Sequence, residues 1–213
     1  HPPQTPTHVT KLAELERFLA QLVATGNPPG LSLVVVKEGK LVYNRAFGLA
    51  DGPRQSAATP ETVYHWWSMT KIVTALAILQ LHEQGRLRLD DPVSVYLPNF
   101  QVQYPAGASP AITIRHLLNH SSGLPDPVPA MLGWVHYDDA SVDQTALLHR
   151  HLPRYNRLQF TPGSKARYTN LGYMVLGAVI EAVSGQRYAD YVTAHILRPL
   201  GMSQTGFLYT REM

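Results

Sequence analysis

The stretch that begins at Ser68 is apolar on nearly every face of a helix, and this feature constrains the fold more than any other. It carries no polar stripe and ends at Gly85, a residue type that commonly follows the last helical turn. Its apolar residues are Ile72, Val73, Ala75, Leu76, Ile78 and Leu79. A helix without a polar face must be covered from all sides, so the pattern predicts a central, buried helix.

The composition supplies enough apolar material to cover such a helix. Of the 213 residues, 45% are hydrophobic and 15% are charged, which predicts a folded chain with a sizeable core rather than disorder. No linker, repeat or low-complexity segment divides the chain after its proline-rich start. We therefore expect a single domain over residues 1–213, with residues 1–9 as a flexible lead-in.

Cysteine content, charge and hydropathy exclude several classes of protein. The chain has no cysteine, which excludes disulfide scaffolds, Cys-ligated zinc, iron–sulfur clusters and a thiol nucleophile. A formal net charge of +3 is too small to indicate nucleic-acid binding. No apolar run approaches the roughly 20 residues that cross a bilayer, so no membrane span is expected.

One window of the sequence is locally basic. No acidic residue lies between Asp143 and Glu181. The basic residues inside that window are Arg150, Arg154, Arg157, Lys165 and Arg167. The window indicates either a solvated basic face or an electrostatic field that favours an anionic substrate.

Two strands and several further helices are predicted around the apolar helix. Thr10 can cap an amphipathic helix that ends at residues 26–30 (Gly-Asn-Pro-Pro-Gly). A β-hairpin follows, with strands over residues 31–37 and 41–49 and a turn at Glu38-Gly39. Further helices are expected over about 113–120, from Ser141 with Gln144 in a capping box, from about Asn170 to Ser184, and over about 188–197. Early strands followed by helices predict the α+β class.

The tetrad from Ser68 to Lys71 (Ser-Met-Thr-Lys) places a hydroxyl in the first turn of the apolar helix and an amine three residues on. Residues i and i+3 lie on one helix face, so the two side chains can touch. A serine hydroxyl attacks when a neighbouring base takes its proton, and a lysine serves as that base when burial lowers its pKa from about 10.4. The helix N-terminus would favour negative charge on a bound carbonyl oxygen.

Taken alone, this tetrad is weak evidence for a catalytic serine. Ser-x-x-Lys occurs by chance about once in a chain of this size, and Ser68 could simply cap the helix. The surrounding segments carry more information, because they resemble the serine β-lactamase-related hydrolases. Thr62-Val63-Tyr64 leads into the tetrad as Thr-x-aromatic leads into Ser-x-x-Lys in that family. Further segments that resemble family counterparts, in the same order, are 85–93, 96–98, 112–124 and 199–202.

Tyr168-Thr169-Asn170 resembles the Tyr-x-Asn motif of class C β-lactamases, D-aminopeptidases and related esterases. The resemblance spans residues 30–207. It implies a β-lactamase/transpeptidase-like fold, in which an antiparallel sheet is flanked by helices beside an all-helical region. It also implies an acyl-enzyme, for which no cofactor is expected.

The same resemblance implies a role for each site residue. Ser68 would be the acylated nucleophile, Lys71 its proton acceptor or proton-network partner, and Tyr168 the relay of a proton to the leaving group. Asn170 would orient the substrate. The chemistry of Tyr168 agrees, because a nearby buried ammonium favours the anionic form of a phenol. The structural alternatives are a packing role for Tyr168 and a helix cap for Asn170.

The chain departs from the family in one respect. Nothing after Asn170 resembles the third family motif, Lys-Thr-Gly or a variant such as His-x-Gly or Trp-x-Gly. In the family that motif lies on a strand that lines the site and gives a backbone N–H to the oxyanion hole. Family members are also considerably longer. We therefore expect this chain to be an N-terminal portion of the enzyme, completed by C-terminal strands from a companion chain or segment.

Other candidate sites are weaker. His116 and His120 lie at i and i+4 and could face one metal ion. However, residue 117 is Leu where a His-Glu-x-x-His zinc protease has its glutamate, and no third ligand is evident, so no metal is expected. Trp66 and Trp67 are more typical of packing than of ligand stacking, although one of them could wall the acyl pocket.

The sequence thus predicts a serine hydrolase that acts through an acyl-enzyme on an ester, a β-lactam or a D-amino-acid peptide or amide. The alternative is a catalytically idle penicillin-binding sensor or interaction protein of the same fold. The expected partners are the small-molecule substrate and the companion segment, with no nucleic acid. The location stays open, with the periplasm or secretion slightly favoured over the cytoplasm.

Overall fold

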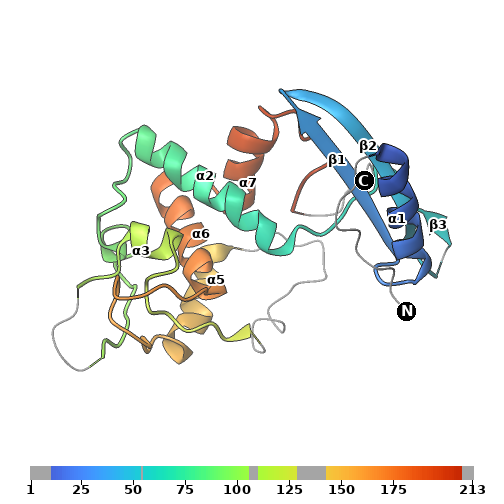
Figure 1. The fold of residues 1–213 in the computed structure, drawn as a ribbon. Coiled ribbons are helices and arrows are strands. Elements are labelled where there is room, and N and C mark those ends of the chain that lie inside the picture. The colour runs from blue at the N-terminus through green and yellow to red at the C-terminus, as the bar shows by residue number, and fades with distance from the viewer. Residues whose placement is uncertain (1–10, 54, 106–109, 129–142, 208–213) are drawn as a thin grey trace. The chain divides into compact units, whose positions relative to one another are not determined.

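The computed structural model of the protein describes residues 11–53, 55–105, 110–128 and 143–207. Contacts within the chain divide it into two compact units, His1–Tyr64 and His65–Met213. The single domain expected over residues 1–213 stays a prediction. Figure 1 labels the helices and strands of both units.

The first unit combines one helix with a small antiparallel sheet. Helix α1 (Leu12–Ala24) precedes strands β1 (Gly30–Lys37) and β2 (Lys40–Asp51), and a short strand β3 (Ser56–Ala57) pairs with the far end of β2. The predicted helix and hairpin are confirmed. The predicted cap Thr10 lies outside the described residues. Strand β3 was not predicted, because two residues are too few to show an alternating pattern.

The hairpin turn has the backbone that its sequence requires. Glu38 and Gly39 both have positive φ angles, 52° and 73°, as a two-residue type I′ turn demands. Tyr43 is the buried residue of β2, and its hydroxyl donates to a Glu16 carboxylate oxygen of α1 at 3.1 Å. Large apolar side chains near the turn are exposed: Val34, Val35, Val36, Leu41 and Val42.

The second unit is largely helical. Its α-helices are α2 (Thr70–Glu83), α3 (Ile114–Leu118), α5 (Gln144–His151), α6 (Asn170–Ser184) and α7 (Tyr188–Val192). Short 3-10 turns occur at Trp67–Met69, Val93–Val95 and Leu152–Arg154, and a π-helical turn at Thr193–Leu197 continues α7. No helix among the described residues is long and apolar enough to cross a membrane.

Helix α6 is the centre of this unit. It contacts α2, α3, α5 and α7 (Figure 1). Its fully buried side chains include Leu171, Val175, Leu176, Val179 and Ile180. The predicted bounds of α6 are confirmed, and the helix ends at Gly185 in the left-handed conformation that glycine favours.

The cap of α6 is Thr169 rather than Asn170. The Thr169 hydroxyl accepts from the Gly172 N–H at 3.4 Å and donates to the Pro125 carbonyl at 2.8 Å. Because Thr169 caps the helix, the side chain of Asn170 is left available for the site, and the structural alternative for Asn170 is wrong.

The other predicted helices are present with shifted ends. Helix α3 is shorter than predicted, and Thr113 and His116 form its capping box. Helix α5 is capped by Asp143, whose carboxylate accepts from the Ala146 N–H at 2.8 Å. The predicted cap Ser141 lies outside the described residues. The helix predicted over 188–197 is confirmed, although its second half has π-helical rather than α-helical bonding.

Helix α2 differs from its prediction in burial. Its buried side chains Val73, Thr74, Ala77, Ile78 and Leu81 form one face. On the rest of its surface, Ile72, Leu76 and Leu79 are 60%, 39% and 45% exposed. The prediction of a helix covered from all sides is therefore wrong for the described part of the chain. The physical reason is that the elements around it, chiefly α6, reach only one face.

Candidate active site

Ser68 lies just before helix α2, in the 3-10 turn Trp67–Met69. The α-helix begins at Thr70, so the prediction that Ser68 belongs to its first turn is wrong by two residues. Trp67 has a φ angle of 46°, a left-handed conformation that is strained for a bulky residue. Ser68 itself is exposed.

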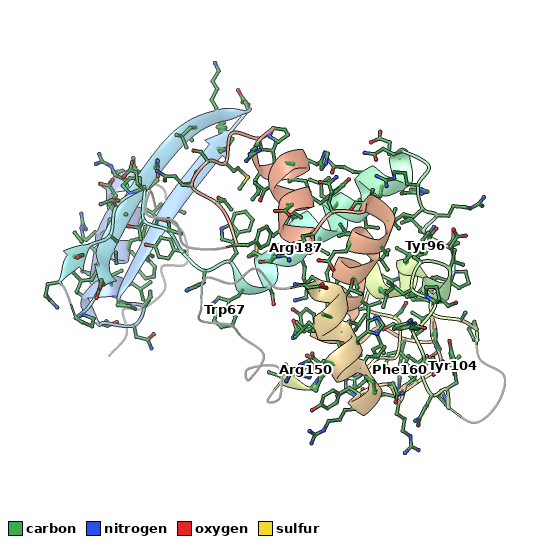
Figure 2. All side chains as sticks on the ribbon, turned by 180° about the vertical axis from the view of Figure 1, so that it is seen from behind. Trp67, Tyr96, Tyr104, Arg150, Phe160 and Arg187 are labelled. Atoms are coloured by element: carbon green, nitrogen blue, oxygen red, sulfur yellow. The ribbon has the colours of Figure 1, made fainter. Side chains whose placement is uncertain are left out.

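The two tryptophans before Ser68 are exposed rather than packed. Trp66 is 39% exposed and Trp67 is 69% exposed, so the packing interpretation is wrong for Trp67. The indole of Trp67 lies 6.2 Å from the His65 ring. Figure 2 shows Trp67 on the segment that leads into α2. A local pattern of aromatic residues does not reveal whether the rest of the fold reaches them.

The structure brings all four predicted site residues together. Ser68 Oγ and Tyr168 Oη are 2.6 Å apart, a hydrogen-bond distance. Lys71 Nζ donates to Ser68 Oγ at 3.3 Å and to Asn170 Oδ1 at 2.7 Å. The Tyr168 hydroxyl lies 3.2 Å from the same Asn170 oxygen and donates to it. A hydroxyl, an amine and a phenol thus share one hydrogen-bonded cluster.

The packing of α2 against α6 creates this cluster. The 3-10 turn and the first turn of α2 carry Ser68 and Lys71, whereas Tyr168 and Asn170 flank the N-cap of α6. The i, i+3 spacing explains the contact between Ser68 and Lys71. The contact with Tyr168 spans 100 residues and depends on how the two helices pack.

Aromatic rings surround the Lys71 ammonium. Its Nζ lies 4.9 Å from the ring centroid of Tyr168 and 5.5 Å from that of Tyr173, within the range of cation–π attraction. The Tyr173 hydroxyl donates to the Leu118 carbonyl at 3.0 Å. Burial, followed by the proximity of Tyr168, raises the pKa of Tyr173. Tyr173 therefore keeps its proton, and its ring attracts the Lys71 ammonium through the cation–π interaction.

The ring of His120 packs against the ring of Tyr168. The two ring centroids are 4.6 Å apart, and the ring of Tyr173 lies 5.1 Å from that of His120. His120 Nδ1 accepts from the Thr169 N–H at 3.2 Å. Burial first, and then the charge of Lys71, lowers the pKa of His120, while Asp126 opposes this shift. Burial and the charge of Lys71 thus favour a neutral His120 imidazole beside Tyr168.

The two histidines weighed as metal ligands have separate hydrogen-bond partners. Nδ1 of His116 accepts from the Thr113 N–H at 3.2 Å, within the capping box of α3. Nδ1 of His120 accepts from Thr169 instead. Among the described residues, no group of three or more His, Cys, Asp or Glu side chains could hold a metal ion.

Asp126 is a site residue that the sequence reasoning missed. Its Oδ1 accepts from the Asn170 backbone N–H at 2.9 Å and from Asn170 Nδ2 at 3.2 Å, and its Oδ2 lies 3.4 Å from Nδ2. No local pattern singles out this aspartate, because its partner is 44 residues away. Tyr173 was also missed, although its i+3 spacing from Asn170 could have placed both residues on one helix face.

Members of the basic window make contacts near the segment that leads into α6. Arg167 donates from its guanidinium to Gln159 Oε1 at 2.9 Å. Lys165 Nζ lies 5.2 Å from the ring centroid of Phe160, which Figure 2 labels together with Arg150. These contacts do not decide between a solvated face and an anion-attracting field, so both interpretations stay predictions.

Comparisons with known proteins place this arrangement in context. The sequence model of the family described as Beta-lactamase matches residues 15–212. "Protein flp" of Staphylococcus aureus (strain MW2) is 34% identical over 92% of this chain and 38% of its own length. "Esterase EstB" of Burkholderia gladioli is 35% identical over 92% of this chain and 51% of its own length.

A solved structure agrees with these sequence matches. The octameric penicillin-binding protein homologue from Pyrococcus abyssi superposes with a TM-score of 0.77 and 36% identity, over 91% of this chain and 44% of that one. The chain therefore spans about two fifths to one half of the length of these relatives.

Proposed function

The chain belongs to the Beta-lactamase family, and we propose that it carries the acylation site of a serine hydrolase. The observation that carries the proposal is the 2.6 Å contact between Ser68 Oγ and Tyr168 Oη, with Lys71 Nζ within hydrogen-bond reach of the same serine. A nucleophile beside a base, with a third group that orients the base, is the arrangement of covalent catalysis.

The proposed reaction proceeds in two halves. Ser68 Oγ attacks the substrate carbonyl while its proton passes to Tyr168 Oη. To accept this proton, Tyr168 must be in its anionic form, and the positive charge of Lys71, 4.9 Å from the centroid of the Tyr168 ring, stabilises that form. Tyr168 then gives the proton to the leaving group as the carbonyl–heteroatom bond breaks. Water attacks the ester formed on Ser68 while Tyr168 takes one proton from that water. Tyr168 then returns this proton to Ser68 Oγ as the acid is released.

The proposed substrates are carbonyl compounds with a good leaving group. An ester is favoured by the similarity to a protein named as an esterase. A β-lactam or a D-amino-acid peptide or amide would pass through the same intermediate. The Ser68 N–H supplies one donor for the carbonyl oxygen, and we propose that a companion C-terminal segment supplies the second.

Covalent labelling tests this proposal. The intact protein should react with a fluorophosphonate or a penicillin at Ser68, and Ser68→Ala should abolish the adduct while the fold stays intact. Ser164→Ala is the matched control, because Ser164 is an exposed serine whose hydroxyl donates to the nearby Thr161 carbonyl at 2.7 Å. Mass spectrometry that placed the adduct on Ser121 or Ser122 would contradict the assignment.

Turnover separates the hydrolase from the alternative. Continuous release of p-nitrophenol from a short acyl ester supports the proposed hydrolase. A single stoichiometric burst would favour the penicillin-binding sensor instead, since an acyl-enzyme that never hydrolyses gives only one equivalent of product. The same measurement with a chromogenic cephalosporin compares β-lactams with esters as substrates.

A further inference from the structure

Tyr168 lies on a segment without regular structure, so its place beside Ser68 depends on contacts from elsewhere in the fold. The three residues from Arg167 to Thr169 belong to no helix or strand. Both sequence neighbours of Tyr168 are bonded to His120, in the loop after α3. The Arg167 N–H donates to the His120 carbonyl at 2.8 Å, and the Thr169 N–H donates to His120 Nδ1 at 3.2 Å. One residue therefore holds the backbone on both sides of Tyr168.

The side chain of His120 also contacts the phenol ring itself. His120 is half-buried, and its ring centroid lies 4.6 Å from that of Tyr168, with 34° between the two planes. Its φ angle is 60°, in the left-handed region that histidine and asparagine enter more readily than most residues. The ring contact needs an aromatic side chain, whereas the bond to Thr169 needs only an acceptor atom. Substitution can therefore separate the two contacts.

The bond to Thr169 requires one protonation state of the imidazole. A backbone N–H can only donate, so His120 Nδ1 must present a lone pair, and the proton of the neutral ring is on Nε2. A charged ring donates from both nitrogens and could not form this bond. Burial and the charge of Lys71 lower the pKa of His120 against the opposing charge of Asp126, so the ring is neutral at pH 7 and above. The titratable groups that face the ring, among the described residues, are Lys71, Asp126, Tyr168 and Tyr173.

We propose that His120 is a positioning residue that holds Tyr168 against Ser68 by accepting the Thr169 N–H through Nδ1. The inference rests on the proposed function, because it concerns the tyrosine that takes the proton of Ser68. The Thr169 N–H belongs to the peptide group that follows Tyr168, so the bond fixes the plane of that group. Without the bond, this peptide group could turn and carry the phenol away from its 2.6 Å contact with Ser68 Oγ. Proton transfer requires that contact, and a displacement of about 1 Å can cost about 100-fold in rate.

Two substitutions of His120 separate the acceptor from the ring. His120→Asn keeps an acceptor, because asparagine Oδ1 lies as many bonds from the backbone as Nδ1, and asparagine tolerates the positive φ angle. His120→Phe keeps an aromatic ring and has no acceptor. Fluorophosphonate labelling of Ser68 is measured at pH 8, where the His120 ring is neutral. We expect His120→Phe to lower the labelling rate by about 10-fold to 100-fold, and His120→Asn to lower it by less than about 5-fold.

His116→Asn is the matched control for the loss of an imidazole. Nδ1 of His116 also accepts from a backbone N–H, that of Thr113, at 3.2 Å, but this bond lies within the capping box of α3. The control should therefore be labelled at the wild-type rate.

Nitrogen NMR of the wild-type protein with isotope-labelled histidine tests the bond directly. It should show His120 as the Nε2–H tautomer, with the signal assigned by its loss in His120→Asn.

The order of the rates decides the inference. His120→Phe labelled at the wild-type rate, His120→Asn losing as much as His120→Phe, or an Nδ1–H tautomer would each overturn it alone. A wild-type protein that is not labelled at Ser68 would overturn the proposed function and the inference with it. If thermal unfolding shows that His120→Phe does not fold, His120→Ala takes its place, because it differs from His120→Asn in lacking the acceptor while neither variant has a ring.

Discussion

At the scale of single residues, Ser68 is contacted by Lys71 from α2 and by Tyr168 from the segment just before α6, and each of the two can be altered without emptying the core. Tyr168 is 45% exposed, and the ring survives in Tyr168→Phe. We expect Tyr168→Phe and Lys71→Ala each to lower the rate of acylation by at least about 100-fold, the low end of what positioned proton transfer contributes. Rapid-mixing measurements with a p-nitrophenyl ester and with a β-lactam give these rates.

Tyr96→Phe provides the control for the loss of a phenol. The Tyr96 hydroxyl donates to an Asp91 carboxylate oxygen and accepts from the Arg88 N–H, and neither residue belongs to the site. Removal of the Tyr96 hydroxyl should lower the free energy of unfolding by about 1 kcal/mol and leave the rate of acylation unchanged. If Tyr168→Phe turned over both the ester and the β-lactam at the full rate, Tyr168 would have a structural role only. The Tyr-x-Asn resemblance would then not indicate a catalytic tyrosine in this chain.

A second prediction at this scale concerns acid. Burial lowers the pKa of His116, and burial together with Lys71 lowers that of His120. A histidine whose pKa is lower in the folded than in the unfolded state binds a proton on unfolding, so its contribution to stability is present above the unfolded value of about 6.5 and lost as the pH falls. We expect the midpoint of thermal unfolding to fall between pH 7 and pH 5.

His116→Gln isolates one of these groups. Glutamine suits the N3 position of a capping box, so it can keep the bond to Thr113 without titrating. The variant should lose less stability than the wild type over the same pH range, as measured by circular dichroism melts. His149→Gln, at an exposed position of α5, controls for the loss of an imidazole. An identical pH dependence in wild type and His116→Gln would contradict the prediction.

At the scale of elements, the loop after α3 is held by a close backbone approach. Gly123 has a φ angle of 81°, and a Cβ atom there would lie 2.3 Å from the Phe160 carbonyl oxygen. Its own carbonyl accepts from the Gln159 N–H at 2.8 Å. We expect Gly123→Ala to destabilise the protein by more than about 2 kcal/mol, because backbone strain and a backbone clash add.

Gly185→Ala separates these two causes. Gly185 ends α6 with a φ angle of 72°, but nothing lies within 4 Å of its added Cβ. Alanine at this position should cost only the left-handed backbone energy, about 1 kcal/mol. Urea unfolding of both variants gives the comparison. Equal losses would show that the loop around Gly123 relaxes without cost.

The elements differ in how well their sequences predict them. The reason is that some features depend on neighbouring residues in the sequence, whereas others depend on contacts between distant segments. Helix α6 and the hairpin were predicted because a local period, a cap and a turn residue such as Gly185 or Gly39 define them. The burial of α2 was predicted wrongly, because a local apolar pattern cannot tell which faces meet a partner. Spacing alone predicted the contact between Ser68 and Lys71. Tyr168 and Asn170 came from the family resemblance, and the contact between Asp126 and Asn170 had no local signal.

At the scale of the whole molecule, each unit leaves apolar side chains exposed. In the first unit they include side chains near the hairpin turn, and in the second they include Ile72, Leu76 and Leu79 of α2. Exposed apolar patches commonly mark contact surfaces. The matched part covers 38% and 51% of the length of the two curated relatives.

We therefore predict that a companion C-terminal segment covers these surfaces. Residues 1–213 expressed alone should melt without a cooperative transition and hydrolyse esters poorly, and co-expression with the companion segment should restore both properties. Calorimetry and p-nitrophenol release measure the two effects. A soluble, cooperatively melting and fully active monomer of residues 1–213 would contradict this prediction.

The separation of 100 residues between Ser68 and Tyr168 has a consequence for folding. Closing so long a loop lowers the entropy of the chain, and contacts within a single helix do not offset this loss. Neither helix alone contains a complete site. The nucleophile and its base therefore meet only when α2 and α6 have docked. A probe that reacts with Ser68 counts the docked molecules in a population and distinguishes them from chains that have formed their helices without assembling them.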